Sequence, residues 1–199
     1  MRRLTLSLLL LFLWSCSNAQ TTTEENAPEE AVPPKFVLVF SKTEGFRHES
    51  IEKGVETLRK LGRDNGFVVL QTETSEDFNT TNLANYQLVV FLSTTQDVLN
   101  DTQQVAFENY IKGGGSFMGI HAATDTEYDW PWFGKLVGGY FNGHPNNPNI
   151  RAAKIDVLDN SHPSTAHLAK IWQRSDEWYN YKILNPNMKV LLILDVSSY

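Results

Sequence analysis

The chain has 199 residues, of which 41% are hydrophobic and 12% aromatic, so it is long enough for one mixed α/β domain and too short for two. Its 17 Lys and Arg residues against 23 Asp and Glu residues leave a formal net charge of -6. No basic run follows the first three residues, so we expect no nucleic-acid partner.

The first residues predict an exported protein. Two arginines precede an apolar stretch over residues 4–14, which is too short to span a bilayer and is typical of a signal peptide. The only cysteine, Cys16, follows in a context that resembles the lipobox of bacterial lipoproteins, where this cysteine is acylated. We therefore expect residues 1–16 to be a lipoprotein signal peptide and the protein to be lipid-anchored in the bacterial cell envelope. The alternative is an ordinary signal peptide cleaved near Ala19.

Residues 17–34 are rich in Thr, Glu, Asn and Pro and have almost nothing to bury, which predicts a disordered tether. The folded domain is expected to cover residues 35–199. Because Cys16 is the only cysteine, this domain has no thiol, and disulfides, cysteine-based metal sites and cysteine nucleophiles are excluded there.

The domain is predicted to begin with a strand over residues 36–40, an apolar run typical of a strand buried on both faces of a parallel sheet. A polar loop leads to a helix that ends at Gly62 or Gly66. The spacing predicts that Ile51, Val55, Leu58 and Leu61 form the buried face of that helix. Further strands are predicted at 67–70 and 86–92, separated by a polar connection with a short helical turn.

A second helix is predicted to start at Asn100, because Gln103 three residues later completes a capping box, and to end at the glycines from Gly113. A strand over residues 116–120 follows. Strands that alternate with helices at this spacing predict an α/β fold with a doubly wound, mostly parallel sheet and three layers. In such folds the ligand crevice lies beyond the carboxyl ends of the strands.

Residues 124–148 read as irregular chain rich in aromatics, glycines and acids, which is typical of a functional insertion. Its aromatic side chains either pack a loop onto the core or stack on sugar rings. We assign Trp130 and Trp132 to the wall of the crevice, with Asp125 as a further substrate-binding candidate. Asp125, Glu127 and Asp129 are interpreted as solvated loop residues, although an acid pair with Glu177 is an alternative.

The rest of the chain is predicted to form a strand at 150–158, a helical turn at 164–169, and strands near 171–173 and 190–194.

His121 occupies the centre of a Gly119-Ile120-His121-Ala122-Ala123 run at a strand-to-helix corner. Small residues two before and two after a polar residue match the spacing of a nucleophile elbow, which would project His121 into the crevice. The alternative is a strand end with an incidental histidine. His144 precedes a proline and is therefore held in extended backbone.

Five segments resemble motifs of the ThuA (trehalose utilisation) family in family order. They are residues 46–51 (FRHESI), 113–121 (GGGSFMGIH), 138–145 (GGYFNGHP), 159–163 (DNSHP) and 176–179 (DEWY). The resemblance covers about residues 35–195 and implies a class I glutamine amidotransferase-like (flavodoxin-like) fold and a role in the metabolism of trehalose and related disaccharides. Family members usually continue past the strand at 190–194, so we expect the chain to be truncated at the C-terminus.

The resemblance also bears on the chemistry, because related amidotransferases carry a nucleophilic cysteine where His121 stands, so glutaminase activity is not expected. Strands 36–40 and 116–120 would lie about 10 Å apart, which allows His48 to approach His121. We expect His48, His121 and Glu177 to be catalytic. His48, His121 and His144 are predicted ligands of a divalent metal such as zinc. The alternative keeps these residues as metal-free acid/base and hydroxyl-binding groups.

The expected function is therefore that of an envelope protein in the metabolism of trehalose, another disaccharide or an oxidised sugar. If it is an enzyme, we expect a sugar-processing hydrolase, lyase or isomerase. The alternative is a non-catalytic sugar-binding or accessory module tethered to the membrane.

Overall fold

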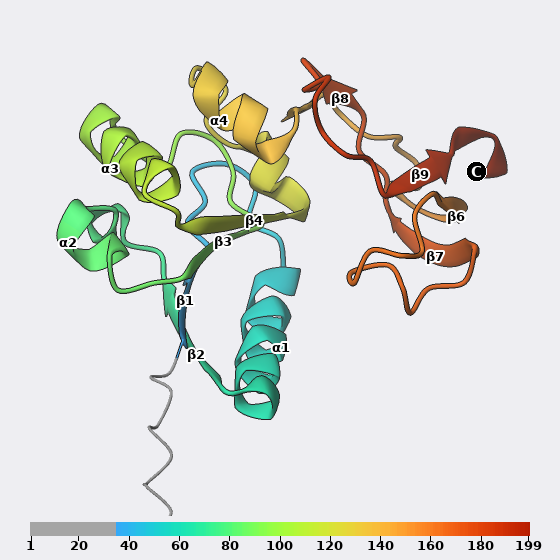
Figure 1. Cartoon of the computed structure of the whole chain (residues 1–199). Coiled ribbons are helices and arrows are strands. Elements are labelled where there is room, and N and C mark those ends of the chain that lie inside the picture. The colour runs from blue at the N-terminus through green and yellow to red at the C-terminus, as the bar shows by residue number, and fades with distance from the viewer. Residues whose placement is uncertain (1–34) are drawn as a thin grey trace, which may run out of the picture. The chain divides into compact units, whose positions relative to one another are not determined.

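The computed structural model describes residues 35–199 (Figure 1). The predicted signal peptide, the predicted lipidation site Cys16 and the predicted tether at 17–34 therefore lie outside the described residues. Within residues 35–199, no helix is both long enough and apolar enough to cross a membrane.

The first half of the described chain alternates strands with helices: β1 (Lys35–Phe40), α1 (Ser50–Asn65), β2 (Phe67–Thr72), η1 (Ser75–Asp77), α2 (Thr80–Leu83), β3 (Leu88–Leu92), α3 (Asp101–Lys112), β4 (Ser116–Ile120) and η2 (His121–Asp125). The second half consists mainly of strands: α4 (Pro131–Val137), β5 (Tyr140–Phe141), β6 (Ile150–Val157), β7 (Ile171–Glu177), β8 (Tyr181–Lys182), β9 (Leu192–Asp195) and η3 (Val196–Ser198).

The main sheet is parallel and has the strand order β2-β1-β3-β4. The step from β1 to β2 runs in one direction across the sheet and the step from β3 to β4 in the other. Because parallel crossovers are right-handed, their helices lie on opposite faces. Figure 1 shows α1 on one side of the sheet, and α2 and α3 on the other. The predicted doubly wound α/β fold is confirmed.

Two hydrophobic clusters, one on each face, explain why β1 is apolar throughout. Leu38 and Phe40 point into a core that they share with Phe107 of α3. Val37 and Val39 point to the other face, into the cluster beneath α1. Successive side chains of a strand face opposite ways, so a strand covered on both faces needs an unbroken apolar run.

The ends of the two longer helices follow the sequence signals. Gly66 ends α1 with a φ of 73°, in the left-handed region that favours glycine. At the start of α3, the Asn100 side chain accepts from the Gln103 backbone N–H, and the Gln103 side chain accepts from the Asn100 N–H. The predicted capping box is confirmed.

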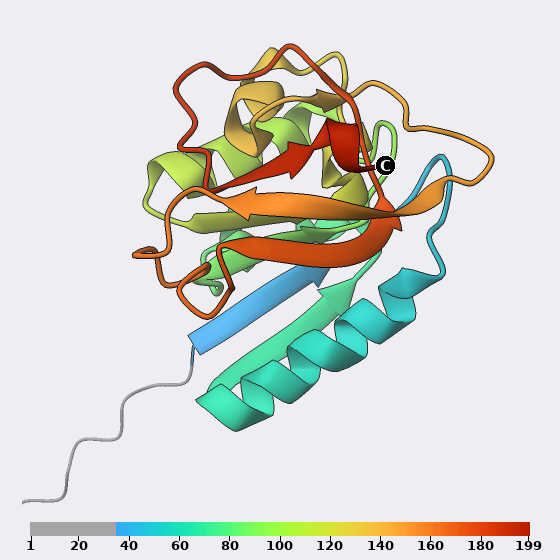
Figure 2. The ribbon, with the colours of Figure 1, turned by 90° about the vertical axis from the view of Figure 1, so that its right-hand side faces the viewer.

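The C-terminal strands form a separate antiparallel sheet with the order β7-β6-β9, seen side by side in the orange-to-red part of the chain in Figure 2. The strand predicted at 171–173 is longer than expected, since β7 continues to Glu177. The helical turn predicted at 164–169 is partly confirmed, because the Ala166 N–H donates to the His162 carbonyl as in one turn of α-helix, but the pattern does not continue into a helix.

The prediction of irregular chain over residues 124–148 is also partly wrong. This segment contains the helix α4, which starts at Pro131 and is followed by Gly138 with a φ of 101°. It also contains β5, which pairs with the unpredicted strand β8. Proline at the first helical position and glycine after the last are both favoured signals, but seven residues are too few to show a helical period.

Candidate functional site

His121 follows directly after β4 and has a φ of 52°, the left-handed region that a side chain other than glycine rarely adopts. Small neighbours allow this corner, because a Cβ atom at Gly119 would lie 3.1 Å from the Ala123 Cβ and 3.2 Å from Val137. The geometry is that of an elbow that presents one side chain at the carboxyl end of the sheet. Backbone strain of this kind concentrates at functional sites.

His48 reaches His121 from the loop after β1. Only β3 lies between β1 and β4. The loop is held across the sheet end by a bridge between Thr43 and Thr95 and by the Glu44 N–H, which donates to the Thr95 carbonyl at 3.0 Å. The two imidazole rings meet edge to face, with their centroids 4.6 Å apart.

Glu177, the last residue of β7, lies among three histidines. Its Oε2 is 3.3 Å from His121 Nε2 and 3.6 Å from His48 Nε2. Its Oε1 is 3.3 Å from His144 Nε2. We call these four residues the His/Glu cluster. The cluster joins the carboxyl end of the parallel sheet to the antiparallel sheet.

Burial and charge set the protonation of this cluster. Burial, and then the charge of His48, lower the pKa of His121, although Glu177 opposes them. Burial by itself would raise the pKa of Glu177, but the Asn149 amide and the three histidines lower it below its usual value. A neutral His121 therefore faces an ionised Glu177 near neutral pH.

Tyr179 is a cluster neighbour that the sequence reasoning missed as a site residue. Its hydroxyl lies 3.1 Å from His121 Nε2 and 3.4 Å from His48 Nε2. Burial, followed by the charge of Glu177, strongly raises the pKa of Tyr179, so the phenol keeps its proton and can donate. The signal was available, because residues two apart in extended chain point the same way and Tyr179 follows Glu177 at that spacing.

The predicted ligand His144 lies in the cluster through Nε2, while its Nδ1 is 3.0 Å from the Pro145 carbonyl oxygen. Since a carbonyl only accepts, Nδ1 carries the proton in this geometry. The predicted substrate-binding residue Asp125 also lies close by: burial raises its pKa, while hydrogen bonding from Tyr128 and the charge of His48 lower it.

The two predicted sugar-stacking tryptophans do not line this site. Trp130 is only 8% exposed and packs in the core against Phe107 and Phe133, while its indole N–H donates to Glu108. Trp132 stacks on Trp130 and packs against the same core. The hydrophobic effect thus assigns both rings to packing on α3, which corrects the crevice-wall interpretation.

Glu127 departs from the predicted solvated loop as well, since it is only 1% exposed. Its carboxylate accepts the backbone N–H groups of Val98 and Leu99 and the Gln104 amide. It therefore connects the chain after β3 to the chain after η2.

His48, His121 and Glu177 offer ligand atoms that lie within 4.8 Å of one another, a spacing at which a metal ion could be held. Metal bonds of about 2.0–2.1 Å at tetrahedral angles put ligand atoms roughly 3.3–3.4 Å apart. The 3.3 and 3.6 Å distances from Glu177 Oε2 fit that requirement. One feature fits less well: His48 Nδ1 is buried without a hydrogen-bond partner among the described residues, whereas a ligand histidine usually donates from this nitrogen.

Comparisons with known proteins identify the family and support the fold. A family model described as "Trehalose utilisation" (ThuA) matches residues 36–199. A crystal structure described as a putative ThuA-like protein from Bacteroides uniformis is 24% identical, with a TM-score of 0.68, and the match covers 84% of this chain and 71% of that one. No curated protein matches significantly.

Proposed function

Because the chain belongs to the ThuA family, a trehalose utilisation family, we propose that it is an enzyme that acts on trehalose or a related disaccharide at the His/Glu cluster. The observation that carries the proposal is the convergence of three imidazole Nε2 atoms on one carboxylate, at 3.3 to 3.6 Å. Each of these groups can hold or exchange a proton in the reaction of a sugar. A cysteine nucleophile plays no part, because the elbow holds histidine.

In this proposal His121 is the general base. Burial lowers its pKa, so Nε2 is free to accept a proton from a sugar hydroxyl or from water. Glu177, 3.3 Å away, stabilises the imidazolium that results. Tyr179 keeps its proton and donates a hydrogen bond to the same nitrogen or to a sugar oxygen.

A divalent cation such as zinc is the alternative form of this proposal, in which His121 is a ligand and not the base, because a coordinated Nε2 has no lone pair left to accept a proton. His48, His121 and, in place of the predicted His144, Glu177 would hold the cation. When bound, it would polarise a sugar oxygen or lower the pKa of a water molecule. Because His48 lacks a partner for Nδ1, we expect its affinity to be about 10–100-fold below that of a site with a complete outer shell. The cation should therefore exchange during dialysis against a chelator.

The aromatic contacts for the sugar are reassigned to two exposed rings that flank the cluster. Phe46 is 70% exposed although its ring lies 4.9 Å from that of His48. Tyr181 is 47% exposed and its ring lies 6.4 Å from that of Tyr179. Large exposed rings beside a polar site support sugar stacking better than the buried Trp130 does.

The test combines metal binding with turnover, on protein purified without a histidine tag. Zinc titration should show one site in the wild type, and His121→Ala and Glu177→Gln should each weaken it by at least about tenfold. His162→Ala is the matched control, since His162 is half-buried and its Nδ1 bonds to Ser164 outside the cluster. Loss of zinc in His162→Ala, or retention in His121→Ala, would contradict the metal assignment.

Turnover of trehalose and related disaccharides is measured on the same variants. Activity that survives metal removal but requires His121 would keep the enzyme proposal and reject the cation. Disaccharide binding that requires His121 but gives no turnover would replace the enzyme by a sugar-binding module. If the protein neither binds nor turns over any disaccharide, the proposal is overturned.

A further inference from the structure

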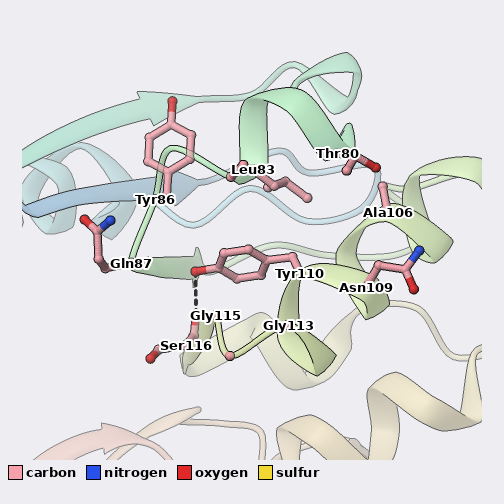
Figure 3. Close-up of a pocket in the computed structure, with 12 residues that line it drawn as sticks. Thr80, Leu83, Tyr86, Gln87, Ala106, Asn109, Tyr110, Gly113, Gly115 and Ser116 are labelled. Atoms are coloured by element: carbon pink, nitrogen blue, oxygen red, sulfur yellow. Dashed lines mark hydrogen bonds between the residues drawn. The ribbon is translucent and has the colours of Figure 1, made fainter.

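A second pocket, with a volume of about 540 Å³, lies away from the His/Glu cluster, where β3 and β4 begin between α2 and α3 (Figure 3). Its wall includes Ser116, the first residue of β4, whereas His121 follows the last residue of that strand. At about 3.3 Å per residue, the length of β4 separates the pocket from the cluster by roughly 16 Å. The pocket is therefore a distinct feature and not an extension of the site.

Two tyrosines, Tyr86 and Tyr110, line the pocket. Tyr110 is fixed, because its hydroxyl donates to the Ser116 carbonyl at 3.2 Å and its ring lies on Gly115. A Cβ atom at Gly115 would be 2.3 Å from that ring, so only glycine allows this close approach. Figure 3 shows Tyr86 and Leu83 across the opening from the Tyr110 ring. Burial raises the pKa of both tyrosines, which keeps them neutral.

The polar lining is uncharged as well. Gln87 lies at the rim, and its Oε1 accepts the Phe36 N–H at 2.6 Å, which fixes the orientation of the amide. Among the described residues that line the pocket there is no Asp, Glu, Lys, Arg or His. Leu83 and Ala106 add apolar side chains to the lining, although both are largely buried. Ligands with a net charge would find no counter-ion here, so a neutral ligand is favoured.

We propose that this pocket binds the pyranose ring of a neutral sugar as a second, non-catalytic carbohydrate site. A pyranose has apolar C–H faces that stack on tyrosine rings and a hydroxyl edge that bonds to amides and backbone groups, which are the two kinds of surface present here. The choice of trehalose as the probe rests on the proposed function. The pocket and its lining do not depend on that function.

The experiment is a trehalose titration of the ¹⁵N-labelled full chain, followed by NMR. The backbone amides of Gly113, Gly114 and Gly115 line the pocket and report on it directly. We expect these three signals to shift and saturate with trehalose, and to do so equally in His121→Ala, because that residue lies in the other site. Glucose 6-phosphate should not shift them.

Two variants make the result decisive. Tyr86→Ala removes one stacking ring and should weaken binding about tenfold. Ala84→Trp places a large side chain at an exposed lining position and should abolish the shifts. Ala152→Trp, at an exposed position of β6, is the control that should leave them unchanged.

Glycine signals that stay unmoved at high trehalose, or that move equally in Ala84→Trp, would overturn the second site. That failure would leave the proposed function standing, because turnover and zinc binding are measured at the other end of the sheet. If no disaccharide is turned over but the glycine signals shift and saturate, the proposed function fails and the second site stands.

Discussion

Glu127, which the sequence predicted in a solvated loop, is the most deeply buried carboxylate among the described residues. Its protonation should therefore affect the stability of the fold. Burial raises the pKa of Glu127 above the ordinary 4.5, even though the Leu99 N–H and the Gln104 amide lower it. Between the unfolded and folded pKa values, the folded state binds more protons than the unfolded state. The contribution of the Glu127 carboxyl group to stability is therefore fully present below its unfolded-state pKa and is lost as the pH rises through its folded-state pKa.

Glu127→Gln is uncharged at every pH and keeps an oxygen for the N–H groups of Val98 and Leu99. We expect it to be at least as stable as the wild type at pH 8, with an advantage that shrinks toward pH 4. Glu127→Ala leaves two buried N–H groups unpaired and should cost about 3 kcal/mol or more. Urea unfolding at pH 4, 6 and 8 measures both. A Gln variant that becomes relatively less stable as pH rises would contradict the assignment.

Residue by residue, the sequence predicted the cluster members better than their partners. His121 could be predicted because the elbow has a local spacing, with glycine and alanine two residues on either side. Tyr179 was missed as a site residue although it follows Glu177 at the two-residue spacing of extended chain, because its contact with His48, 131 residues away, forms only in the tertiary structure. Trp130 was misassigned because composition does not distinguish a ring that packs from a ring that binds.

At the scale of elements, the corner between β4 and η2 depends on contact between small residues. A Cβ atom added at Gly119 would lie 3.1 Å from the Ala123 Cβ and 3.2 Å from a Val137 methyl group. Gly119→Ala needs only a small shift of these neighbours, whereas Gly119→Val inserts two further methyl groups. We expect Gly119→Val to cost about 1–3 kcal/mol and Gly119→Ala clearly less. Thermal unfolding of both variants checks the order, and equal stability would show that the corner is looser than described.

The capping box of α3 offers a second test at this scale. Asn100→Ala removes the acceptor for the Gln103 N–H and should cost about 1 kcal/mol. Asn109→Ala, at an exposed position within the same helix, is the matched control and should be neutral or slightly stabilising, because alanine has the higher helix propensity. Urea unfolding of the two variants separates the loss of the cap from the effect of replacing asparagine by alanine in a helix. An equal loss in both would argue against the cap.

Helices and strands whose apolar residues repeat with a clear period were predicted, and the other elements were not. The buried strands β1 and β3 and the helices α1 and α3 each carry an apolar pattern or a cap that a local window contains. β7 reads IWQRSDE and has no apolar alternation, so neither its length nor its pairing with β6 could be predicted. Since Glu177 ends this strand, its place beside His121 depended on tertiary structure alone.

At the scale of the whole molecule, the cluster requires both sheets. His48 and His121 follow strands of the parallel sheet, β1 and β4, and Glu177 ends a strand of the antiparallel one. Zinc bound across these two parts should stabilise the folded state by an amount that grows with free zinc, as for any ligand that binds only the native form. The effect should raise the melting temperature of the wild type and of His162→Ala, and disappear in Glu177→Gln.

The remaining prediction concerns where the protein resides, and it depends on residues outside the described structure. We propose that Cys16 is acylated and that the mature protein is held at the membrane of the bacterial envelope. A single acyl chain binds a bilayer only marginally, so stable attachment needs the two or three chains that a bacterial lipoprotein carries. Wild-type protein should therefore sediment with membranes and resist extraction by salt.

Cys16→Ala removes the only thiol and with it the acylation site. The variant should be released into the soluble fraction or remain unprocessed, with its signal peptide attached. Ser15→Ala, one residue earlier, is the matched control and should still sediment. Wild-type protein found wholly in the soluble fraction, with an amino terminus at Gln20 or later, would reject lipid anchoring. It would leave export intact, because an ordinary signal peptide cleaved near Ala19 gives that terminus.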